Sequence, residues 1–262
     1  MRTVQIDFPA EGVGRITLDR PHVLNAINQE LLDDFVTATK GLEKDPAVRS
    51  VILTGAGRAF SAGFDLKAEA EEGTQPVEVW VDRFTESWEV FLGIWRSAKP
   101  YIAAVRGHNL GGALELSLLA DVTIAGHDAK FGLPEIRHAG GPGAAMLPWI
   151  TGMKAAKLLM LTGESIDAQR ALELGVVTSV VSPDQLDEES VRIASVLAAV
   201  PPMAMKLTKL ALNRTYERMG FLGAVNENYM ISTVLNATTE YREQEELRQE
   251  IPLKAFLQRR DS

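Results

Sequence analysis

Two glutamates are candidates for acid–base chemistry because of the residues that surround them. Glu115 lies in ALELSLLA, residues 113–120, a helix pattern that is apolar on nearly every side. A carboxylate there either reaches an edge of the helix, where it meets solvent or an arginine, or it is buried, where the charged form is costly. Glu135 follows Pro134 in FGLPEI, where proline and glutamate also suit an ordinary helix N-terminus. Each carboxylate therefore has a catalytic and a structural interpretation.

Glycine-rich turns flank these two carboxylates. Residues 61–65 (SAGFD) follow a predicted strand, and Gly111-Gly112 begins the helix that carries Glu115. Glycines in such turns leave backbone N–H groups able to face an oxyanion, and a helix N-terminus adds its dipole. Two donors from separate loops are what an oxyanion hole for an enolate requires. Either turn taken alone is equally consistent with a tight connection.

Other motifs do not point to a cofactor. Gly55-Ala56-Gly57 follows a predicted strand, as in a dinucleotide-binding fingerprint, but Phe60 occupies the position of the third glycine. The four histidines show no metal-ligand spacing, and each is more readily explained as a structural or surface residue. We therefore expect neither a metal site nor a nicotinamide cofactor.

The composition excludes several classes of protein. The 262 residues contain no cysteine, which excludes disulfides, thiolate nucleophiles and Cys-ligated metals. The balance of 27 Lys and Arg against 35 Asp and Glu, net −8, argues against a nucleic-acid surface. The longest uncharged run, residues 138–153, is too short and too rich in glycine for a membrane span. The N-terminus enters a strand-like pattern with no apolar signal core. We expect a cytoplasmic protein without membrane contact.

Strands and helices that would position the candidate residues alternate along the first part of the chain, which predicts an α/β fold. A hairpin with one buried face is expected over residues 4–18, and short buried strands at 50–54, 101–105 and 122–125. Helices are expected at residues 28–44, with Asn28 as N-cap, then at 79–95 and at 113–120.

Only helices are expected after residues 176–181. Their predicted ranges are 184–200, 204–214, 221–236 and 241–258. The Pro201-Pro202 pair marks a boundary, so we expect an α/β body at residues 1–200 and a helical region at 201–262. The charged run at residues 240–250 (EYREQEELRQE) is interpreted as a solvated helix face with i,i+4 pairs and no function.

The order and spacing of these segments resemble the crotonase (enoyl-CoA hydratase/isomerase) superfamily over essentially the whole chain. That resemblance implies a spiral of ββα turns with a C-terminal helical trimerisation region, assembled as a homotrimer or a dimer of trimers. The matching segments are LDRP at 18–21 with Asn25-Ala26, VILTG at 51–55, FSAGFDLK at 60–67, residues 99–105 with Gly107, GGALEL at 111–116, Asp121, FGLPE at 131–135, Pro142-Gly143, and LTG at 161–163 with residues 168–177.

The resemblance also implies a reaction, the addition of water across the 2,3-double bond of an enoyl-CoA. Backbone N–H groups of Phe64 and Gly112 would hold the thioester oxygen as it gains enolate charge. Glu115 would activate the water and Glu135 would deliver a proton at C2. Gly143 matches a backbone position that helps to place the water. Coenzyme A enters as part of the acyl-CoA substrate, so no separate cofactor is expected.

The coenzyme A moiety is expected along two segments of the body, completed by the final helix across a subunit interface. Local cations can hold its phosphates despite the acidic balance of the whole chain. The implied positions are Arg20, His22, Leu24, Ala26, Ala62, Asp65, Leu66, Lys67, Phe256 and Arg259.

Two segments depart from the family pattern. Residues 142–148 (PGAAMLP) replace the usual Pro-Gly-x-Gly-Gly, and His108-Asn109 stands where an aromatic and a small residue are usual. His138 lies three residues after Glu135 and so can share a helix face with it. We hypothesise that His138 or Asn109 contacts a polar acyl group. The alternative is a solvated or structurally bonded side chain.

Related activities and other classes stay open on the sequence. FSAGFDLKA at 60–68, with LPE at 133–135, also resembles the carnitinyl-CoA dehydratase branch. An isomerase can shuttle a proton with Glu135 alone, whereas the presence of Glu115 favours a hydratase. The broken glycine fingerprint argues against an NAD-binding dehydrogenase. The presence of both carboxylates argues against a catalytically silent scaffold of the same fold.

Overall fold

Six strands form the main sheet, in the order β1-β2-β3-β4-β6-β9. The computed structural model describes residues 1–73, 75–143 and 145–261. The β1–β2 hairpin is antiparallel, as expected, and each later strand joins its neighbour in parallel. The strands are β1 (Val4–Ala10), β2 (Val13–Leu18), β3 (Ser50–Gly55), β4 (Tyr101–Val105), β6 (Val122–Gly126) and β9 (Ser179–Val181).

A second, three-stranded sheet runs alongside, formed by β5 (His108–Leu110), β7 (Lys130–Gly132) and β8 (Ile166–Asp167). In the repeats of the spiral that build the site, one strand joins the main sheet, the next strand joins the second sheet, and a helix follows. This is the ββα spiral that the resemblance implies. A bridge between Ser61 and Asn109 extends the second sheet to the loop that carries Phe64. Strands of two or three residues are too short to show a periodic pattern in the sequence.

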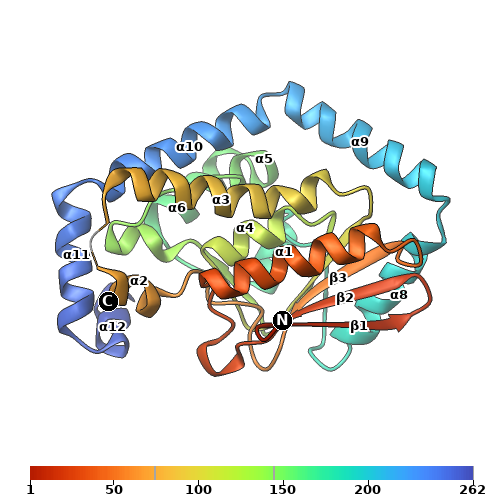
Figure 1. Ribbon diagram of the computed structural model, residues 1–262, viewed down its shortest axis with the longest axis horizontal. Coiled ribbons are helices and arrows are strands. Elements are labelled where there is room, and N and C mark those ends of the chain that lie inside the picture. The colour runs from red at the N-terminus through yellow and green to blue at the C-terminus, as the bar shows by residue number, and fades with distance from the viewer. Residues whose placement is uncertain (74, 144, 262) are drawn as a thin grey trace.

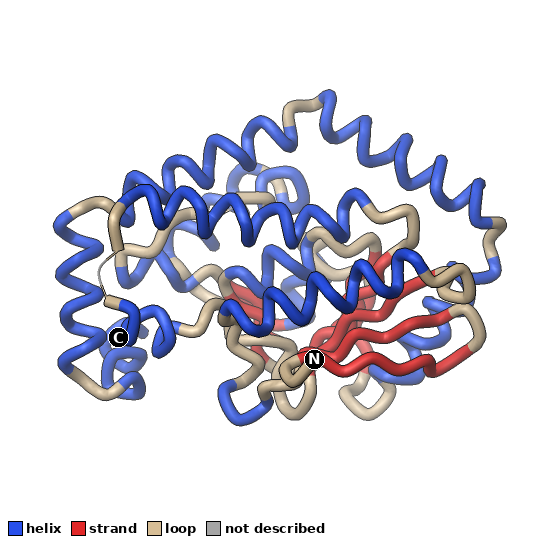
Figure 2. The backbone as a smooth tube through the Cα atoms, in the orientation of Figure 1, coloured by secondary structure: helices blue, strands red, loops and turns tan. Residues whose placement is uncertain are grey.

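Helices cover both faces of the main sheet (Figures 1 and 2). Ile52 packs toward α8 and the next residue, Leu53, packs toward the core under α1, because side chains alternate along a strand. Asn28 caps α1 by accepting from the Leu31 N–H at 3.1 Å, as expected. The elements of the body are α1 (Gln29–Lys44), α2 (Leu66–Glu72), α3 (Val77–Arg96), α4 (Gly112–Leu118), α5 (Leu147–Thr151), α6 (Met153–Thr162), α7 (Ala168–Glu173), α8 (Leu186–Ala199) and the 3₁₀ helices η1 (Pro21–Val23) and η2 (Pro134–His138).

Four further helices follow the body: α9 (Pro202–Arg218), α10 (Phe221–Asn236), α11 (Thr239–Glu250) and α12 (Leu253–Asp261). Figure 1 shows α9 and α10 crossing above the body and α11 turning down beside α2. The prediction of one helix over 241–258 is wrong. Ile251 is extended, with φ −118° and ψ 151°, because the following Pro252 disfavours helical backbone before it and cannot donate an N–H.

One buried lysine anchors α9 to the body. The Lys209 ammonium donates to Asp121 Oδ2 at 2.7 Å and to the carbonyl oxygens of Ile94 and Lys99 at 3.0 and 3.1 Å. These contacts satisfy all three donors of the ammonium group. The middle of α9 is thereby fixed to the body.

The charged run at residues 240–250 has the solvated face that was expected, with Arg242, Glu243 and Glu246 exposed, but it also has a buried face that was not expected. Tyr241, Glu245 and Arg248 are 5%, 1% and 7% exposed. Their i, i+4 and i+7 spacing places them on one face of α11, and this face packs toward α2. Among the described residues, no single helix has the length and apolar composition of a membrane span, and only the bent pair α8 and α9, at 104°, meets both criteria together.

Candidate active site

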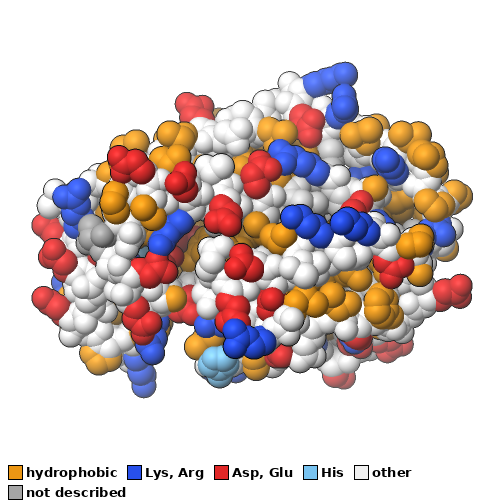
Figure 3. All heavy atoms as spheres, in the orientation of Figure 1, with side chains coloured by type: hydrophobic (Ala, Val, Ile, Leu, Met, Phe, Trp, Pro, Cys, Tyr) orange, Lys and Arg blue, Asp and Glu red, His pale blue; other side chains and the backbone are white. Residues whose placement is uncertain are grey.

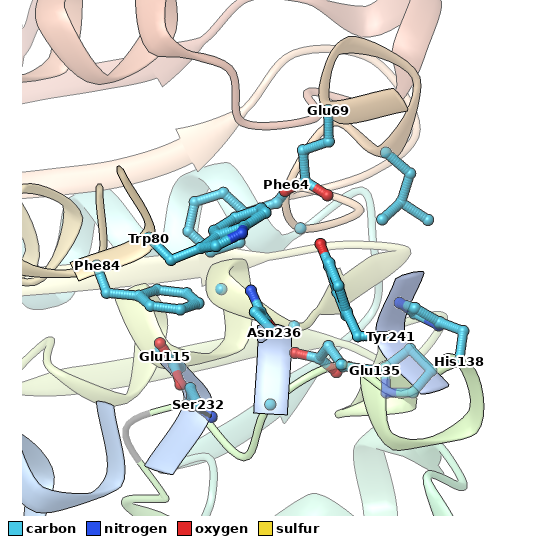
Figure 4. A pocket seen from close by; sticks show the side chains of 18 of the residues that line it. Phe64, Glu69, Trp80, Phe84, Glu115, Glu135, His138, Ser232, Asn236 and Tyr241 are labelled. Carbon is cyan, nitrogen blue, oxygen red and sulfur yellow. Dashed lines mark hydrogen bonds between the residues drawn. The ribbon is translucent and has the colours of Figure 1, made fainter. Parts of the chain in front are cut away.

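A cavity of about 110 Å³ lies where the body meets α10 and α11. It brings together five residues to which the sequence assigned chemistry: Phe64, Gly112, Glu115, Glu135 and Gly143. Figure 4 shows the two carboxylates on the same side of this cavity, with aromatic side chains from α3 opposite. The other lining residues are Ala62, Gly63, Leu66, Glu69, Trp80, Phe84, Gly111, Pro134, His138, Gly140, Gly141, Tyr229, Ser232, Asn236, Tyr241 and Arg248.

The Phe64 N–H owes its direction to a strand-like bridge with Ile27. Ile27 N donates to Gly63 O at 2.8 Å, and Asp65 N donates to Ile27 O at 2.9 Å. In a parallel bridge of this kind the intervening residue turns its N–H to the opposite side. The Phe64 N–H has no acceptor among the described residues, so it is available to a ligand.

The Gly112 N–H is the second donor. Gly112 is the first residue of α4, and the first N–H groups of a helix have no acceptor within the helix. Among the described residues this N–H also has no acceptor elsewhere. A Cβ at Gly112 would lie 2.5 Å from Cε2 of Phe64. The two donors therefore come from adjacent turns in van der Waals contact, as an oxyanion hole needs.

Glu115 is buried and does not reach a solvated edge of its helix, and its catalytic interpretation stays a prediction. The residue is 5% exposed. Its Oε2 accepts a 2.8 Å hydrogen bond from the hydroxyl of Tyr229 on α10. Burial is the main cause that raises the pKa of Tyr229 well above 10, followed by the neighbouring Glu115 and Glu135 carboxylates. The phenol therefore stays protonated and acts as the hydrogen-bond donor.

Glu135 stands at a helix start and also lines the cavity, and its catalytic interpretation stays a prediction. Pro134 and Glu135 begin η2, as expected of a helix start, and the carboxylate also lines the cavity. A Cβ at Gly111 would lie 2.9 Å from Glu135 Oε1, which places this oxygen beside the turn that presents the Gly112 N–H. The backbone of Glu135 is held in turn, since Gly140 N donates to the Glu135 carbonyl at 2.7 Å.

Gly143 closes the cavity over Glu115. Its backbone has φ +57°, and a Cβ there would lie only 2.0 Å from Glu115 Oε1. Its N–H donates to Ser232 Oγ on α10 at 3.2 Å. Only glycine allows this close approach, and the proposed placing of a water by Gly143 stays a prediction. Ala144, in the segment that departs from the family pattern, lies outside the described residues.

The two segments expected to hold coenzyme A lie side by side, because Ala62 N donates to Leu24 O at 2.9 Å. Ala62 and Leu66 line the cavity. Arg20 is not a free cation: its guanidinium pairs with Asp65 at 2.9 Å and donates to the carbonyl of Ala26. The other predicted positions of these segments also lie outside the cavity lining, Leu24 and Ala26 included. His22 and Lys67 are exposed, and Asp65 caps α2 by accepting from Ala68 N.

The two positions on the final helix differ in their surroundings. Phe256 is buried and packs edge-on against the ring of His138, with centroids 5.8 Å apart. Within one chain, Phe256 therefore holds α12 against η2. Arg259 is exposed on the next turn of α12. Their contribution to a nucleotide site stays a prediction.

Of the two residues expected to contact a polar acyl group, only His138 lines the cavity. The expectation for Asn109 is corrected by the structure. Asn109 is fully buried in β5, and its amide donates to Ser117 Oγ at 2.7 Å. The second sheet turns this side chain behind α4, toward the core rather than toward the cavity.

The sequence interpretation missed the residues that α10 and α11 contribute. Tyr229, Ser232 and Asn236 stand at i, i+3 and i+7 on the face of α10 that lines the cavity. Tyr241 and Arg248 come from the run that was read as solvated. The sequence signal that could have identified these residues is the helical spacing of polar residues among apolar ones. In the described part of the chain, no group of three or more His, Asp or Glu could hold a metal ion.

Known proteins resemble this chain over most of its length. The family model of enoyl-CoA hydratase/isomerase matches residues 9–260. A probable enoyl-CoA hydratase of Rhizobium meliloti (strain 1021) is 39% identical over 208 residues, 78% of this chain and 79% of that protein. The 2,3-dehydroadipyl-CoA hydratase of Escherichia coli (strain K12) is 35% identical over 248 residues, 94% and 92% of the two chains. The crystal structure of an enoyl-CoA hydratase/isomerase from Xanthobacter autotrophicus Py2 has a TM-score of 0.95 at 40% identity, with 99% and 97% covered.

Proposed function

The chain belongs to the enoyl-CoA hydratase/isomerase family, and from that premise we propose that it adds water across the 2,3-double bond of an enoyl-CoA. The observation that carries this proposal is the juxtaposition in one cavity of two carboxylates, Glu115 and Glu135, with the unengaged N–H groups of Phe64 and Gly112. The enzyme is a hydro-lyase, and coenzyme A arrives as part of its substrate.

The two N–H groups act on the thioester carbonyl. When water adds at C3, negative charge moves onto the thioester oxygen as an enolate forms. Donors fixed in advance stabilise this developing charge without reorganisation, which lowers the barrier. The Phe64 and Gly112 N–H groups are fixed by the Ile27 bridge and by the start of α4, so they have the rigidity that this role requires.

The two glutamates divide the proton transfers. Glu115 takes a proton from the water as its oxygen attacks C3, and Glu135 gives a proton to C2 of the enolate. The Tyr229 hydroxyl donates to Glu115, which stabilises the carboxylate form that a base needs. An isomerase needs only one proton shuttle. The burial of Glu115 and its bond to Tyr229 therefore favour a hydratase.

Phosphate groups of coenzyme A need cations outside the cavity. Arg20, Lys67 and Arg259 are the candidates, although Arg20 pairs with Asp65 and Lys67 lies 3.7 Å from Glu71. A phosphate would compete with these exposed or half-buried carboxylates for the cations. Location in the cytoplasm stays a prediction, with which the cysteine-free composition is consistent.

Exposed apolar side chains support self-assembly of the chain as a homotrimer or a dimer of trimers. Met203 and Leu207 of α9 project into solvent, and Figure 3 shows hydrophobic side chains gathered over this helix. Large exposed apolar patches often mark protein–protein interaction sites. Further exposed residues lie on α6 and α10, namely Met153, Leu158, Leu161, Met230, Ile231 and Val234.

The proposed function is tested by hydration of crotonyl-CoA, followed as loss of the absorbance of the enoyl thioester. The Glu115→Gln and Glu135→Gln variants keep the shape of each side chain and remove its acid–base chemistry. We expect kcat to fall by about 10²–10⁴-fold in each. An unmodified protein that hydrates no enoyl-CoA of any chain length would refute the proposal.

A further inference from the structure

Part of the cavity wall is polar and is not used by the hydration reaction. Glu69 of α2, Asn236 of α10, and Tyr241 and Arg248 of α11 line the cavity together with the catalytic residues. Figure 4 shows the Tyr241 hydroxyl pointing toward the Glu69 carboxylate, with Asn236 beside them. The two N–H groups engage C1 and the two catalytic glutamates engage C2 and C3. The remaining wall therefore faces the rest of the acyl chain.

Charge in this wall is fixed by an ion cluster around Arg248. One guanidinium nitrogen contacts Glu69 Oε2 at 3.2 Å, and another contacts Glu245. Tyr241 donates to Glu245 Oε1 at 3.5 Å. Two carboxylates share one guanidinium, and the nearby Arg83 is paired with Glu72. Arg248 and Arg83 are therefore both paired with carboxylates already, and a further anion would have to compete with these carboxylates for them.

Two buried polar atoms in this wall have no hydrogen-bond partner among the described residues. They are Oδ1 of Asn236 and Nε of Arg248, and both residues are more than nine-tenths buried. Asn236 offers an amide, which can donate and accept, and Arg248 offers a donor. A hydroxyl group can accept from one and donate to another. A carboxylate only accepts, and a trimethylammonium group does neither.

The size of the cavity limits the length of the acyl chain. Its volume of about 110 Å³ is below the roughly 150 Å³ of an apolar cavity that holds one benzene molecule. A short chain with few carbons beyond C3 fills such a space. Trp80 and Phe84 of α3, on the opposite wall, cover its methylene groups.

Resting on the proposed hydratase activity, we infer that the preferred substrate is a short 2-enoyl-CoA whose acyl chain ends in an uncharged hydroxyl group. The hydroxyl meets the Asn236 amide and the Glu69–Tyr241–Arg248 wall. An unsubstituted chain of the same length leaves these polar groups unsatisfied. Chains ending in a carboxylate would have to compete with Glu69 and Glu245 for Arg248.

The inference is tested with matched enoyl-CoA substrates of four to six carbons. At each length, kcat/KM is measured for chains ending in methyl, hydroxyl, carboxylate or trimethylammonium. We expect the best hydroxyl-bearing chain to exceed its unsubstituted counterpart by about tenfold, because buried polar groups left unpaired discriminate strongly. The inference is overturned if either charged chain is preferred, or if hydroxyl and methyl chains are used equally.

Two variants test which residues of the wall produce the preference for a hydroxyl-bearing chain. Asn236→Leu keeps the approximate shape and removes the amide, so the hydroxyl-to-methyl ratio should fall toward one. Glu69→Gln removes one of the two carboxylates that pair with Arg248, so kcat/KM for the carboxylate chain should rise by about tenfold. Glu71→Gln, on the exposed side of α2, is the matched control and should change neither ratio. Unchanged ratios in both Asn236→Leu and Glu69→Gln would overturn the assignment of this wall.

Failure of the inference and failure of the proposed function are distinguishable. If crotonyl-CoA is hydrated but the hydroxyl chain is not preferred, only the inference fails. If no enoyl-CoA is hydrated, the proposed function fails. The wall is then tested by calorimetric binding of saturated acyl-CoAs, where tighter binding of the hydroxyl-bearing chain than of its methyl counterpart supports the inference and equal binding overturns it.

Discussion

The hydroxyl of Tyr229 lies 2.8 Å from Oε2 of Glu115 and donates a hydrogen bond to it. This contact joins two elements far apart in the chain, α10 of the helical region and α4 of the body. The Tyr229 ring is fixed in turn by Trp88 and Phe84 of α3, with centroids 5.3 and 5.8 Å away. The Glu115 carboxylate is thus oriented by a residue that is itself held by aromatic packing.

Replacing this hydroxyl tests whether it positions the base. We expect Tyr229→Phe to lower kcat by about tenfold with little change in KM, because a hydrogen bond to a buried charge is lost while the ring packing remains. The acidic limb of the kcat–pH profile should move to higher pH, since the carboxylate form of Glu115 loses a donor. A purely structural role would lower the melting temperature and leave the pH profile unmoved.

Gly112 is expected to tolerate no side chain. A Cβ at this position would meet the Phe64 ring at 2.5 Å, so Gly112→Ala must displace one of the two oxyanion donors. We expect kcat to fall by about 10²–10³-fold, the usual cost of losing such a donor. The double variant Gly112→Ala with Phe64→Ala removes the obstructing ring and should recover part of the loss. Gly93→Ala, at an α3 glycine with open space around it, is the control.

Alanine variants of Gly143 and Gly152 form a matched pair that tests how closely Gly143 approaches Glu115. Both have positive φ, +57° and +77°, so alanine strains the backbone at either position. Only at Gly143 would the new Cβ also meet the Glu115 carboxylate, at 2.0 Å. We expect both variants to melt at lower temperature and only Gly143→Ala to lose most of its kcat at a temperature where both are folded. Equal activities would contradict the close approach.

The N-terminal strand is tied to α1 in a pH-dependent way. Asp34 accepts from the N–H groups of Thr3 and Arg2 at 3.0 and 2.7 Å, and the Thr3 bond is the largest cause that lowers the pKa of its carboxyl. A lowered folded pKa adds stability above the unfolded value of about 3.9, and this stability is lost as the pH falls through the folded value.

Urea unfolding of the unmodified protein and of Asp34→Asn checks this sign. The unmodified protein should be the more stable at pH 7, and its advantage should shrink as the pH is lowered below about 4. Asp33→Asn, at the exposed neighbour of the same helix, should give a smaller difference. A difference between the unmodified protein and Asp34→Asn that stays constant from pH 7 to pH 3 would contradict the role of the ionised carboxylate.

Much of the fold followed from local patterns. The β1–β2 hairpin, the buried strands β3, β4 and β6, and helices α1, α3, α8, α9 and α10 were predicted within a few residues, because apolar periodicity reports which face of an element is buried. The break at Pro252 was overlooked although proline signals it. The short strands of the second sheet left no periodic trace, and they are what turned Asn109 away from the cavity.

The sequence by itself determined which groups could do chemistry: a carboxylate in an apolar helix, a second one after Pro134, and glycine turns that free backbone N–H groups. Tertiary structure alone decided what surrounds them. Tyr229, Asn236, Tyr241 and Arg248 are ordinary polar positions on amphipathic helices until α10 and α11 dock on the body. Local periodicity gives each helix a face, but the partner of that face is set by long-range packing, where buried polar groups must find one another.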